Sequence, residues 1–478
     1  MIADTRNETA PVLVWFRRDL RLCDHAALTA ACATGRPVIP VFIHDDAVAG
    51  LGAAPRFRLD LGLRALDAAL REKGSRLILR RGGAQEVLRQ LIVETGARSV
   101  FWTRLYDPAS QARDSALKSA LKQEGIEARS FAGHLLFEPW TVQTGTGGPY
   151  RVFSPMWRAV AGRAVDGLLP PPDRIAAPDD WPGREPLDDW QLQRDMRRGA
   201  RVVAAHVQAG EAAALDRLDD FCALAMGRYK AERDLPGVDG TSRLSDYLSL
   251  GEISPHRCWA AALRAGEAGA AGAETFRKEL VWREFAYHLM YHTPHILTDN
   301  WRPEWQGFLW NTDGGTAPVT AWKQGRTGVP LVDAAMREMY VTGRMHNRAR
   351  MIAASYLTKH LLTDWRIGRD WFEQHLTDWD PASNAMGWQW VAGCGPDASP
   401  YFRIFNPETQ QQKFDPDGAY LCQWIAEGHC DPTPTALSYF DAVPESWALS
   451  PEMPYPQPVV GLREGRERAL DAYHDWRG

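Results

Sequence analysis

The order of hydrophobic and polar positions divides the chain into an N-terminal part with strand periodicity and a later part with helical periodicity. In the first part, short apolar runs alternate with amphipathic segments. The pattern predicts strands at 12–16, 38–43, 76–79, 99–102 and 128–131, and helices at 60–73 and 84–94. Such alternation is typical of right-handed βαβ units, so a Rossmann-like α/β domain with a parallel sheet is expected over residues 1–140.

The pattern changes twice further along the chain. Residues 141–200 have few periodic apolar runs and several prolines, including Pro170-Pro171-Pro172, which indicates a long interdomain linker. From about residue 201 to residue 478 the apolar positions recur with helical spacing. We therefore expect an α/β domain, a linker at 141–200 and an all-α domain over 201–478.

Composition adds limits on the class of protein. A chain of 478 residues exceeds one ordinary hydrophobic core, and 45% apolar residues indicate a globular protein. No apolar run of membrane-spanning length occurs, and residues 1–11 lack an apolar signal core, so a cytoplasmic location without a membrane partner is expected. The seven cysteines are odd in number and contain no Cys-x-x-Cys pair, which argues against disulfides and structural zinc.

Charge and aromatic content also bear on function. The net charge of −5 means that any basic surface for nucleic acid must be local. No Gly-x-Gly-x-x-Gly follows the first strand, so the usual dinucleotide fingerprint is absent there. Twenty tryptophans are many for this length, and indoles stack well on flat ligands and suit electron transfer.

The segment 378–390 is the densest candidate site. It combines two carboxylates, two amides and three indoles, a mixture that an ordinary core does not contain. If this segment is an extended or irregular wall, the rings of Trp388 and Trp390 lie on opposite sides of it. An aromatic-rich turn without a binding role explains the same residues equally well.

Two predicted helices carry further polar groups. The helix over 276–285 presents an acid, an indole and a guanidinium on one face, namely Glu279, Trp282 and Arg283; a surface ion pair beside a core tryptophan is the alternative. Downstream, His288, His292 and His295 have no carboxylate or Cys at a matching interval, so no metal site is expected.

A second helix is expected to open at Gly343 and to continue to residue 362. Its residues Asn347, Arg350 and Met351 share one face. The small hydroxyl run at 240–245 suits a phosphate but also suits a helix cap. The aromatic stretch at 399–410 is either a groove wall or a buried turn.

Five of these motifs occur together and in a fixed order. They are Trp-Phe-Arg-Arg-Asp-Leu-Arg-Leu at 15–22, Gly-Thr-Ser-Arg-Leu-Ser at 240–245, Glu-Leu-Val-Trp-Arg-Glu-Phe at 279–285, Met-His-Asn-Arg at 345–348 and Trp-Gln-Trp at 388–390. Over nearly its whole length the chain resembles the photolyase and cryptochrome family, most closely class I cyclobutane pyrimidine dimer photolyases.

This resemblance implies a light-dependent activity on DNA. The N-terminal domain would be an antenna domain, and the helical domain would hold FAD. Excited reduced FAD would pass an electron to a pyrimidine dimer flipped out of the duplex, and the dimer would split. The implied partner is DNA with cyclobutane pyrimidine dimers, and a monomer is expected. A second antenna chromophore, methenyltetrahydrofolate or deazaflavin, stays unassigned because 102–104 and 296–297 depart from the expected folate contacts.

The resemblance also assigns roles residue by residue. Positions that match flavin-binding residues are Tyr229, Thr241, Ser242, Arg243, Leu244, Ser245, Phe276, Arg283, Arg350, Asp378, Asp380 and Asn384. Positions that match the wall for the damaged bases are Glu279, Trp282, Asn347, Met351 and Trp390. The electron-transfer chain matches Trp388, Trp365 and Trp310. DNA contacts match Arg233, Arg348 and Gln410, together with Glu279, Trp282 and Asn347.

Three alternative functions remain open from the sequence. A (6-4) photolyase is expected to carry histidines where this chain has Met345-His346-Asn347. A cryptochrome photoreceptor usually has another residue at the position of Asn384 and often a long tail. A flavin-dependent electron carrier would share the FAD pocket but would have no use for Glu279, Asn347 and Met351 on facing helices.

Overall fold

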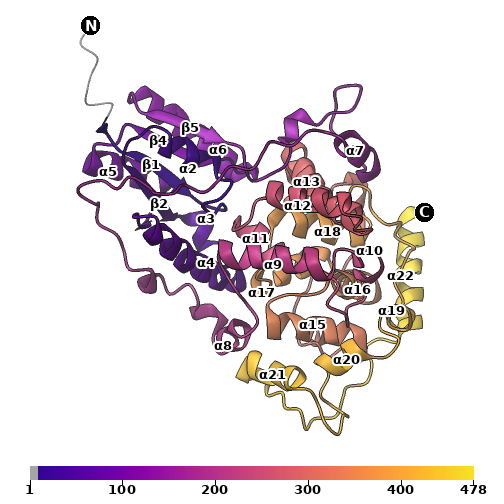
Figure 1. Cartoon of the computed structure of the whole chain (residues 1–478). Coiled ribbons are helices and arrows are strands. Elements are labelled where there is room, and N and C mark those ends of the chain that lie inside the picture. Colours follow the sequence, from indigo (N-terminus) through magenta and orange to yellow (C-terminus); the bar gives the residue numbers. More distant parts are fainter. Residues whose placement is uncertain (1–8) are drawn as a thin grey trace.

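The computed structural model describes residues 9–478. Its N-terminal part contains a five-stranded sheet in the order β3-β2-β1-β4-β5, and every neighbouring pair is parallel (Figure 1). The strands are β1 (Val12–Phe16), β2 (Val38–His44), β3 (Ile78–Arg81), β4 (Ser99–Thr103) and β5 (Glu127–Phe131). The predicted parallel sheet is confirmed, with β3 two residues later than expected.

Both faces of this sheet are buried. Alternate residues of β1 enter two separate cores: Val12, Val14 and Phe16 pack on one face, and Leu13 and Trp15 on the other. The first face is covered by α2 (Ala26–Cys32) and α4 (Ala53–Glu72), and the second by α5 (Ala84–Thr95) and α6 (Pro108–Gln123). Burial on both faces explains why the strands are continuous apolar runs.

The segment after β5 first packs on the helical part and then returns to the sheet domain. Its helix α7 (Phe153–Val160) lies in a helical core and contacts α13 (Ala273–His292), whereas Ile175 and Trp190 further along enter the core beneath α2 and α4. The segment reaches α8 (Gly199–Ala204) next to the C-terminal helices (Figure 1). The expected linker is therefore a packed connection rather than a free tether.

Beyond β5, the regular elements of the described chain are helices, and the only strand-like pairing there is an isolated bridge between Asn311 and Thr363. The remaining helices are α9 (Glu211–Leu224), α10 (Tyr229–Glu232), α11 (Ser245–Leu250), α12 (Pro255–Glu267), α13 (Ala273–His292), α14 (Ala317–Lys323), α15 (Pro330–Thr342), α16 (Asn347–Ser355), α17 (Trp365–His375), α18 (Pro381–Ala392), α19 (Pro407–Phe414), α20 (Ala419–Trp424), α21 (Pro434–Ala442) and α22 (Leu462–Arg477). None of the helices in the described part of the chain has the length and hydropathy needed to cross a membrane.

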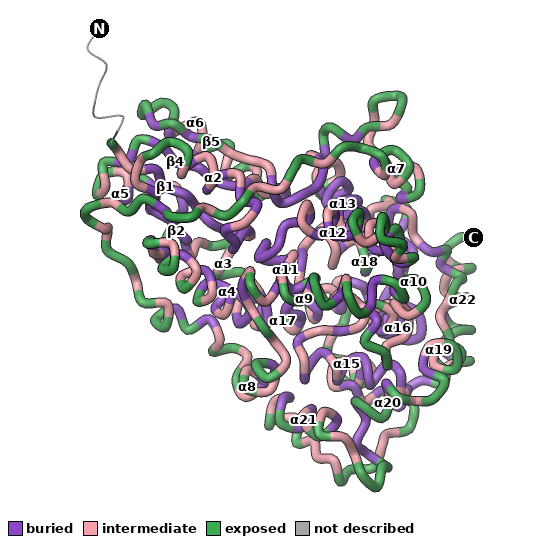
Figure 2. The backbone as a smooth tube through the Cα atoms, in the orientation of Figure 1, coloured by how far each residue is buried: buried purple, intermediate pink, exposed green. Residues whose placement is uncertain are grey.

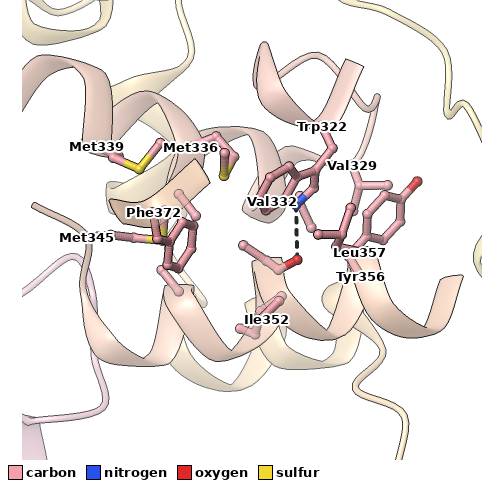
Figure 3. Close-up of a cluster of buried hydrophobic side chains, with 14 of the residues drawn as sticks. Trp322, Val329, Val332, Met336, Met339, Met345, Ile352, Tyr356, Leu357 and Phe372 are labelled. Carbon is pink, nitrogen blue, oxygen red and sulfur yellow. Dashed lines mark hydrogen bonds between the residues drawn. The ribbon is translucent and has the colours of Figure 1, made fainter. Parts of the chain in front are cut away.

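Two buried cores hold the helical part together, and purple backbone runs through its centre in Figure 2. In the first core, the fully buried Trp322 donates its indole N–H to the carbonyl of Ala353 in α16 at 3.0 Å, so the ring is anchored as well as packed (Figure 3). Met336, Met339 and Phe372 fill the space beside it.

Two predictions from the sequence were wrong: one gave a helix too early a start, and the other gave a helical segment the wrong type of structure. The helix expected from Gly343 begins only at Asn347, because Gly343 has a positive φ of 73° that ends α15 and His346 caps α16 through its ring. The segment 378–390, expected to be extended or irregular, is mostly the helix α18. Its start signal is Asp380, whose carboxylate accepts the Ser383 N–H at 2.9 Å, followed by Pro381.

The loop after β1 joins the two domains. The amide of Leu20 donates to the carbonyl of Leu250 at 3.1 Å, and the Arg21 guanidinium donates to the carbonyl of Gly251 at 2.9 Å. Gly251 has a φ of 67°, and a Cβ there would lie 2.2 Å from the Arg18 carbonyl oxygen, so only glycine permits this approach. The motif at 15–22 is thus largely an interdomain joint.

Candidate functional site

Two neighbouring cavities in the helical domain collect most of the residues singled out from the sequence. The loop cavity, named for residues 241–245, has a volume of about 460 Å³, which lies within the usual range of ligand pockets. The indole cavity, named for Trp388, has a volume of about 170 Å³. Predicted residues on the loop cavity are Tyr229, Arg233, Thr241, Ser242, Arg243, Leu244, Ser245, Glu279, Asn347, Arg350 and Asp378. Those on the indole cavity are Asn347, Arg350, Met351, Asp378, Asp380, Asn384 and Trp388.

Asn347, Arg350 and Asp378 line both cavities and form their common wall. The Arg350 guanidinium binds the Asp378 carboxylate at 2.7 Å, while its Nε donates to the carbonyl of Met345, also at 2.7 Å. The second carboxylate oxygen, Asp378 Oδ1, is buried and has no hydrogen-bond partner among residues 9–478. Because such an acceptor is costly when left unpaired, the site fits a ligand that brings a hydrogen-bond donor to this point.

The floor of the loop cavity is suited to a charged ligand. Arg217 fixes the loop by donating to the carbonyls of Thr241 and Ser242 at 2.7 and 2.8 Å. Thr241, Ser242, Arg243 and Arg344 line the cavity, where Arg243 also pairs with Asp239 and Arg344 with Asp246. Hydroxyl and guanidinium donors are what a diphosphate requires, so this half fits the phosphates of a dinucleotide.

An acid stands on the opposite side of the loop cavity. Glu279 of α13 contacts Arg233, and its side chain is 28% exposed towards the cavity. Burial raises the pKa of the Glu279 carboxyl above its ordinary value, although the Arg233 guanidinium opposes the rise. Asp234 next to Arg233 pairs with Arg348 at 2.9 Å, so one chain of alternating charges runs along the rim.

The indole cavity is built from α16, α17 and α18. Met351 of α16 and Asn384 of α18 line it, and the Asn384 amide donates to the carbonyl of Arg369 at 3.0 Å. Trp388 is 3% exposed, and its ring lies directly on Gly368 of α17: a Cβ at 368 would stand 2.0 Å from the ring. Gly368 was missed from the sequence because a lone helical glycine carries no signal of what it contacts.

The other members of the predicted electron-transfer chain lie in or next to α17, the helix on which the Trp388 ring packs. Trp365 opens α17, is fully buried, and donates its indole N–H to Asn300 at 2.8 Å. Trp310 precedes Asn311, whose amide and carbonyl bond the backbone of Leu362 and Asp364 at 2.7 and 2.9 Å, immediately before Trp365. The three indoles therefore occupy adjoining segments.

Among the residues predicted to bind the flavin or the damaged bases, four line neither of the two cavities. Phe276 packs against Phe221 at a ring distance of 4.9 Å, and Trp282 stacks on Phe153 of α7 at 3.7 Å. Trp390 packs at the edge of the core around Trp388. The Arg283 guanidinium turns to the domain joint, where it donates to the carbonyl of His134 at 2.9 Å.

Asp380 faces the domain joint as well as the indole cavity. Its Oδ2 accepts the phenol of Tyr287 at 2.5 Å and the Arg18 guanidinium at 3.2 Å. Burial alone raises the pKa of Asp380, but Arg18 and Arg283 outweigh that effect and hold the pKa below its ordinary value. Asp380, the N-cap of α18, is thus held in place by Arg18 of the N-terminal domain. The sequence did not reveal this contact.

The remaining predicted DNA contacts lie around α19. Arg348 stands over the ring of Phe414 at 4.4 Å, and Gln410 has a buried amide oxygen without a partner among the described residues. A separate cavity of about 710 Å³ lies between the linker at 195–199 and the helices α15 and α21, and none of the predicted site residues lines it. No set of three or more His, Cys, Asp or Glu side chains in residues 9–478 is arranged to hold a metal ion.

The fold and the paired cavities define a two-domain flavoprotein of photolyase type. The family model for the FAD binding domain of DNA photolyase matches residues 276–475, and the DNA photolyase model matches residues 12–176. The deoxyribodipyrimidine photo-lyase of Agrobacterium fabrum is 46% identical over 471 residues, 98% of each chain. That of Escherichia coli is 36% identical and covers 96% of this chain and 98% of its own. The chain belongs to the photolyase and cryptochrome family.

Solved structures agree with this assignment. A bacterial class III photolyase from Agrobacterium tumefaciens superimposes with a TM-score of 0.91 at 45% identity, covering 98% of both chains. A cryptochrome from Synechocystis sp. PCC6803 gives 0.84 at 28% identity, with 97% of this chain and 99% of its own covered. The family and the two-part fold expected from the sequence are confirmed. The subclass, for which we expected class I, stays a prediction, as do the roles of single residues.

Proposed function

We propose that the protein repairs cyclobutane pyrimidine dimers in DNA with light, as a deoxyribodipyrimidine photo-lyase that uses FAD. One observation carries the proposal. The wall formed by Asn347, Arg350 and Asp378 separates a cavity lined by the acid Glu279 from a cavity lined by Trp388, the predicted electron donor. A ligand held at this wall has a charge-stabilising acid on one side and a source of electrons on the other.

FAD bound across this wall would supply the light-driven electron. The residues present fit its parts: Thr241, Ser242 and Arg243 would hold its phosphates, and the Arg350–Asp378 pair would offer it a donor and a free acceptor. Asn384 is held in place on the indole cavity by the Arg369 carbonyl, so its amide oxygen is available to a ring N–H.

Glu279 and Asn347 would act on the substrate. Splitting a dimer after electron uptake places negative charge on a pyrimidine carbonyl, which a hydrogen-bond donor stabilises. The raised pKa of Glu279 favours a carboxyl that carries a proton, and the Asn347 amide provides a second donor. Arg233, Arg348 and Gln410 would contact the strand backbone and position it without reading sequence.

We place the antenna domain at 1–140, the linker at 141–200 and the catalytic domain at 201–478. We further propose that the protein acts on DNA as a monomer in the cytoplasm.

Glu279→Gln tests the proposed activity. It keeps the size of the side chain but replaces the carboxyl by an amide, which is a far weaker acid and therefore stabilises a developing negative charge less. We expect FAD content and binding of dimer-containing oligonucleotides to be retained, and the number of dimers split per absorbed photon to fall. The matched control is Glu274→Gln on the same helix, an exposed residue paired with Lys278 at 2.6 Å, which should leave the yield unchanged.

Two results would decide against the proposal. An unchanged yield in Glu279→Gln removes the catalytic role of this acid. Equal affinity of the unmutated protein for intact and dimer-containing DNA would instead favour a cryptochrome-type photoreceptor, because a photoreceptor needs the flavin but not the damaged bases.

A further inference from the structure

The last indole of the predicted electron-transfer chain is buried. Trp310 is 8% exposed, and its indole nitrogen has no hydrogen-bond partner among the described residues. A relay that is refilled from solution needs an end that meets solvent, because electron tunnelling falls off steeply with distance. Trp310 therefore requires a further donor between itself and the surface.

Trp305 lies directly beside Trp310. The two rings stack with centroids 5.7 Å apart and an interplanar angle of 17°, which favours electronic contact between them. Asn300 also links Trp305 to Trp365, the second indole of the predicted chain. Its side chain accepts the indole N–H of Trp365 at 2.8 Å and donates to the Trp305 carbonyl at 3.0 Å. Trp305 itself is 3% exposed, so it does not reach the surface.

Trp476 of α22 completes the path. Its ring centroid is 4.6 Å from that of Trp305, and the residue is only partly buried at the edge of the core. The helix α22 runs along the outer side of the helical domain, where the chain meets solvent (Figure 1). An indole at this point can exchange protons and electrons with the solution.

Two tyrosines beside the cluster are poorer ends for the path. Tyr401 is 2% exposed, its hydroxyl has no partner among the described residues, and the side-chain nitrogen of Lys359 lies 3.4 Å from its ring centre. Oxidation of a phenol requires loss of its proton, and here no acceptor receives it. Tyr473 is further from Trp305 than Trp476 is, at 6.1 Å.

We propose that Trp305 and Trp476 extend the electron-transfer chain from Trp310 to the protein surface. This inference rests on the proposed flavin-dependent function. Each electron that leaves Trp388 is replaced from Trp365, then from Trp310, Trp305 and Trp476. The oxidised Trp476 releases its indole proton to water. One electron from a thiol reductant in solution and one proton from water then restore it.

The radical end point can be located chemically. The FAD-loaded protein is illuminated with blue light in the presence of a nitroso spin trap, digested, and mapped by mass spectrometry of its peptides. We expect the adduct on Trp476 in the unmutated protein and its loss in Trp476→Phe and in Trp305→Phe. Tyr473→Phe, on the same helix, is the matched control and should keep the adduct on Trp476. FAD content and near-ultraviolet circular dichroism report whether each variant is folded.

The outcomes separate this inference from the proposed function. An adduct on Trp310, Tyr401 or Tyr473 in the unmutated protein overturns the extension, and this result does not depend on how well any variant folds. Trp388→Phe should give no light-dependent adduct anywhere. If it gives the same adduct as the unmutated protein, the tryptophan chain of the proposed function is itself wrong.

Discussion

Asp378→Asn removes the charge of Asp378 while keeping its shape, and it leaves the Arg350 guanidinium unpaired between the two cavities. The side chain of Asp378 is 4% exposed and that of Arg350 is 27% exposed. Breaking a fully buried ion pair costs about 3–5 kcal/mol, whereas exposed pairs are worth less than about 1 kcal/mol. With one partner partly exposed, we expect a cost of about 2–3 kcal/mol.

This cost should appear mainly in FAD binding. In the flavin-free variant, water in the cavities solvates Arg350, and a bound flavin displaces that water. At about 1.4 kcal/mol per factor of ten, FAD should bind about 30- to 150-fold more weakly. Titration of flavin-free protein with FAD, followed by quenching of flavin fluorescence, measures the change, and thermal unfolding without FAD shows how much of it is a loss of stability.

The double variant gives the sharper test. Arg350→Gln combined with Asp378→Asn removes both charges, so it should bind FAD better than Asp378→Asn alone. Asp370→Asn is the control, because Asp370 pairs with Arg369 at 2.6 Å while 62% exposed, and it should leave FAD binding unchanged. If Asp378→Asn retains stoichiometric FAD with the affinity of the unmutated protein, the pair does not face the flavin and the placement of FAD is refuted.

Three further predictions follow from the packing and charges around this site. Trp388→Phe should abolish light-driven reduction of the flavin yet split dimers at the normal rate once the flavin is reduced by dithionite, as a repair assay in both states shows. Gly368→Ala should displace the Trp388 ring, lowering stability by about 1–3 kcal/mol and slowing photoreduction, whereas Gly266→Ala in α12 meets only Ala273 at 3.4 Å and should not destabilise the protein. Burial raises the pKa of Glu284 to about 7, so between the unfolded and folded pKa values the folded protein holds a proton that the unfolded chain releases. The free energy of unfolding, measured from pH 5 to pH 8, should therefore fall as the pH rises toward 7. Glu284→Gln should flatten that part of the profile.

The parallel sheet could be predicted from the sequence because burial on both faces makes each strand a continuous apolar run. The helical conformation of the segment 378–390 could not be predicted in the same way. The segment 378–390 was expected to be extended because its aromatic density masks helical periodicity: apolar residues occur all around α18, since Ala382, Trp388 and Ala392 face different cores or cavities. The Asp380-Pro381 start signal was present in the sequence and outweighed that pattern.

The candidate site was predictable where residues share one helix and unpredictable where their direction depends on tertiary contacts. Asn347, Arg350 and Met351 follow helical spacing, and they line the cavities together. Arg283 has the same spacing relative to Glu279, yet it turns to the carbonyl of His134 in the other domain. Only the position of His134, set by the end of β5, decides this, and periodicity within α13 contains no information about it.

The helix α18 shows why residues of both domains belong to one functional unit. Its first turn is fixed by Asp380, which Arg18 of the N-terminal domain contacts at 3.2 Å. At its other end the Lys359 nitrogen donates to the carbonyl of Ala392 at 2.8 Å, where a donor stabilises the exposed carbonyl end of a helix. Burial lowers the pKa of Lys359 well below its ordinary value. Between these anchors, Asn384 and Trp388 project into the indole cavity. Electron transfer depends steeply on distance. A helix held at both ends therefore keeps Trp388, the predicted donor, at a constant separation from a ligand in that cavity, and the contact of Arg18 with Asp380 makes this separation depend on the N-terminal domain.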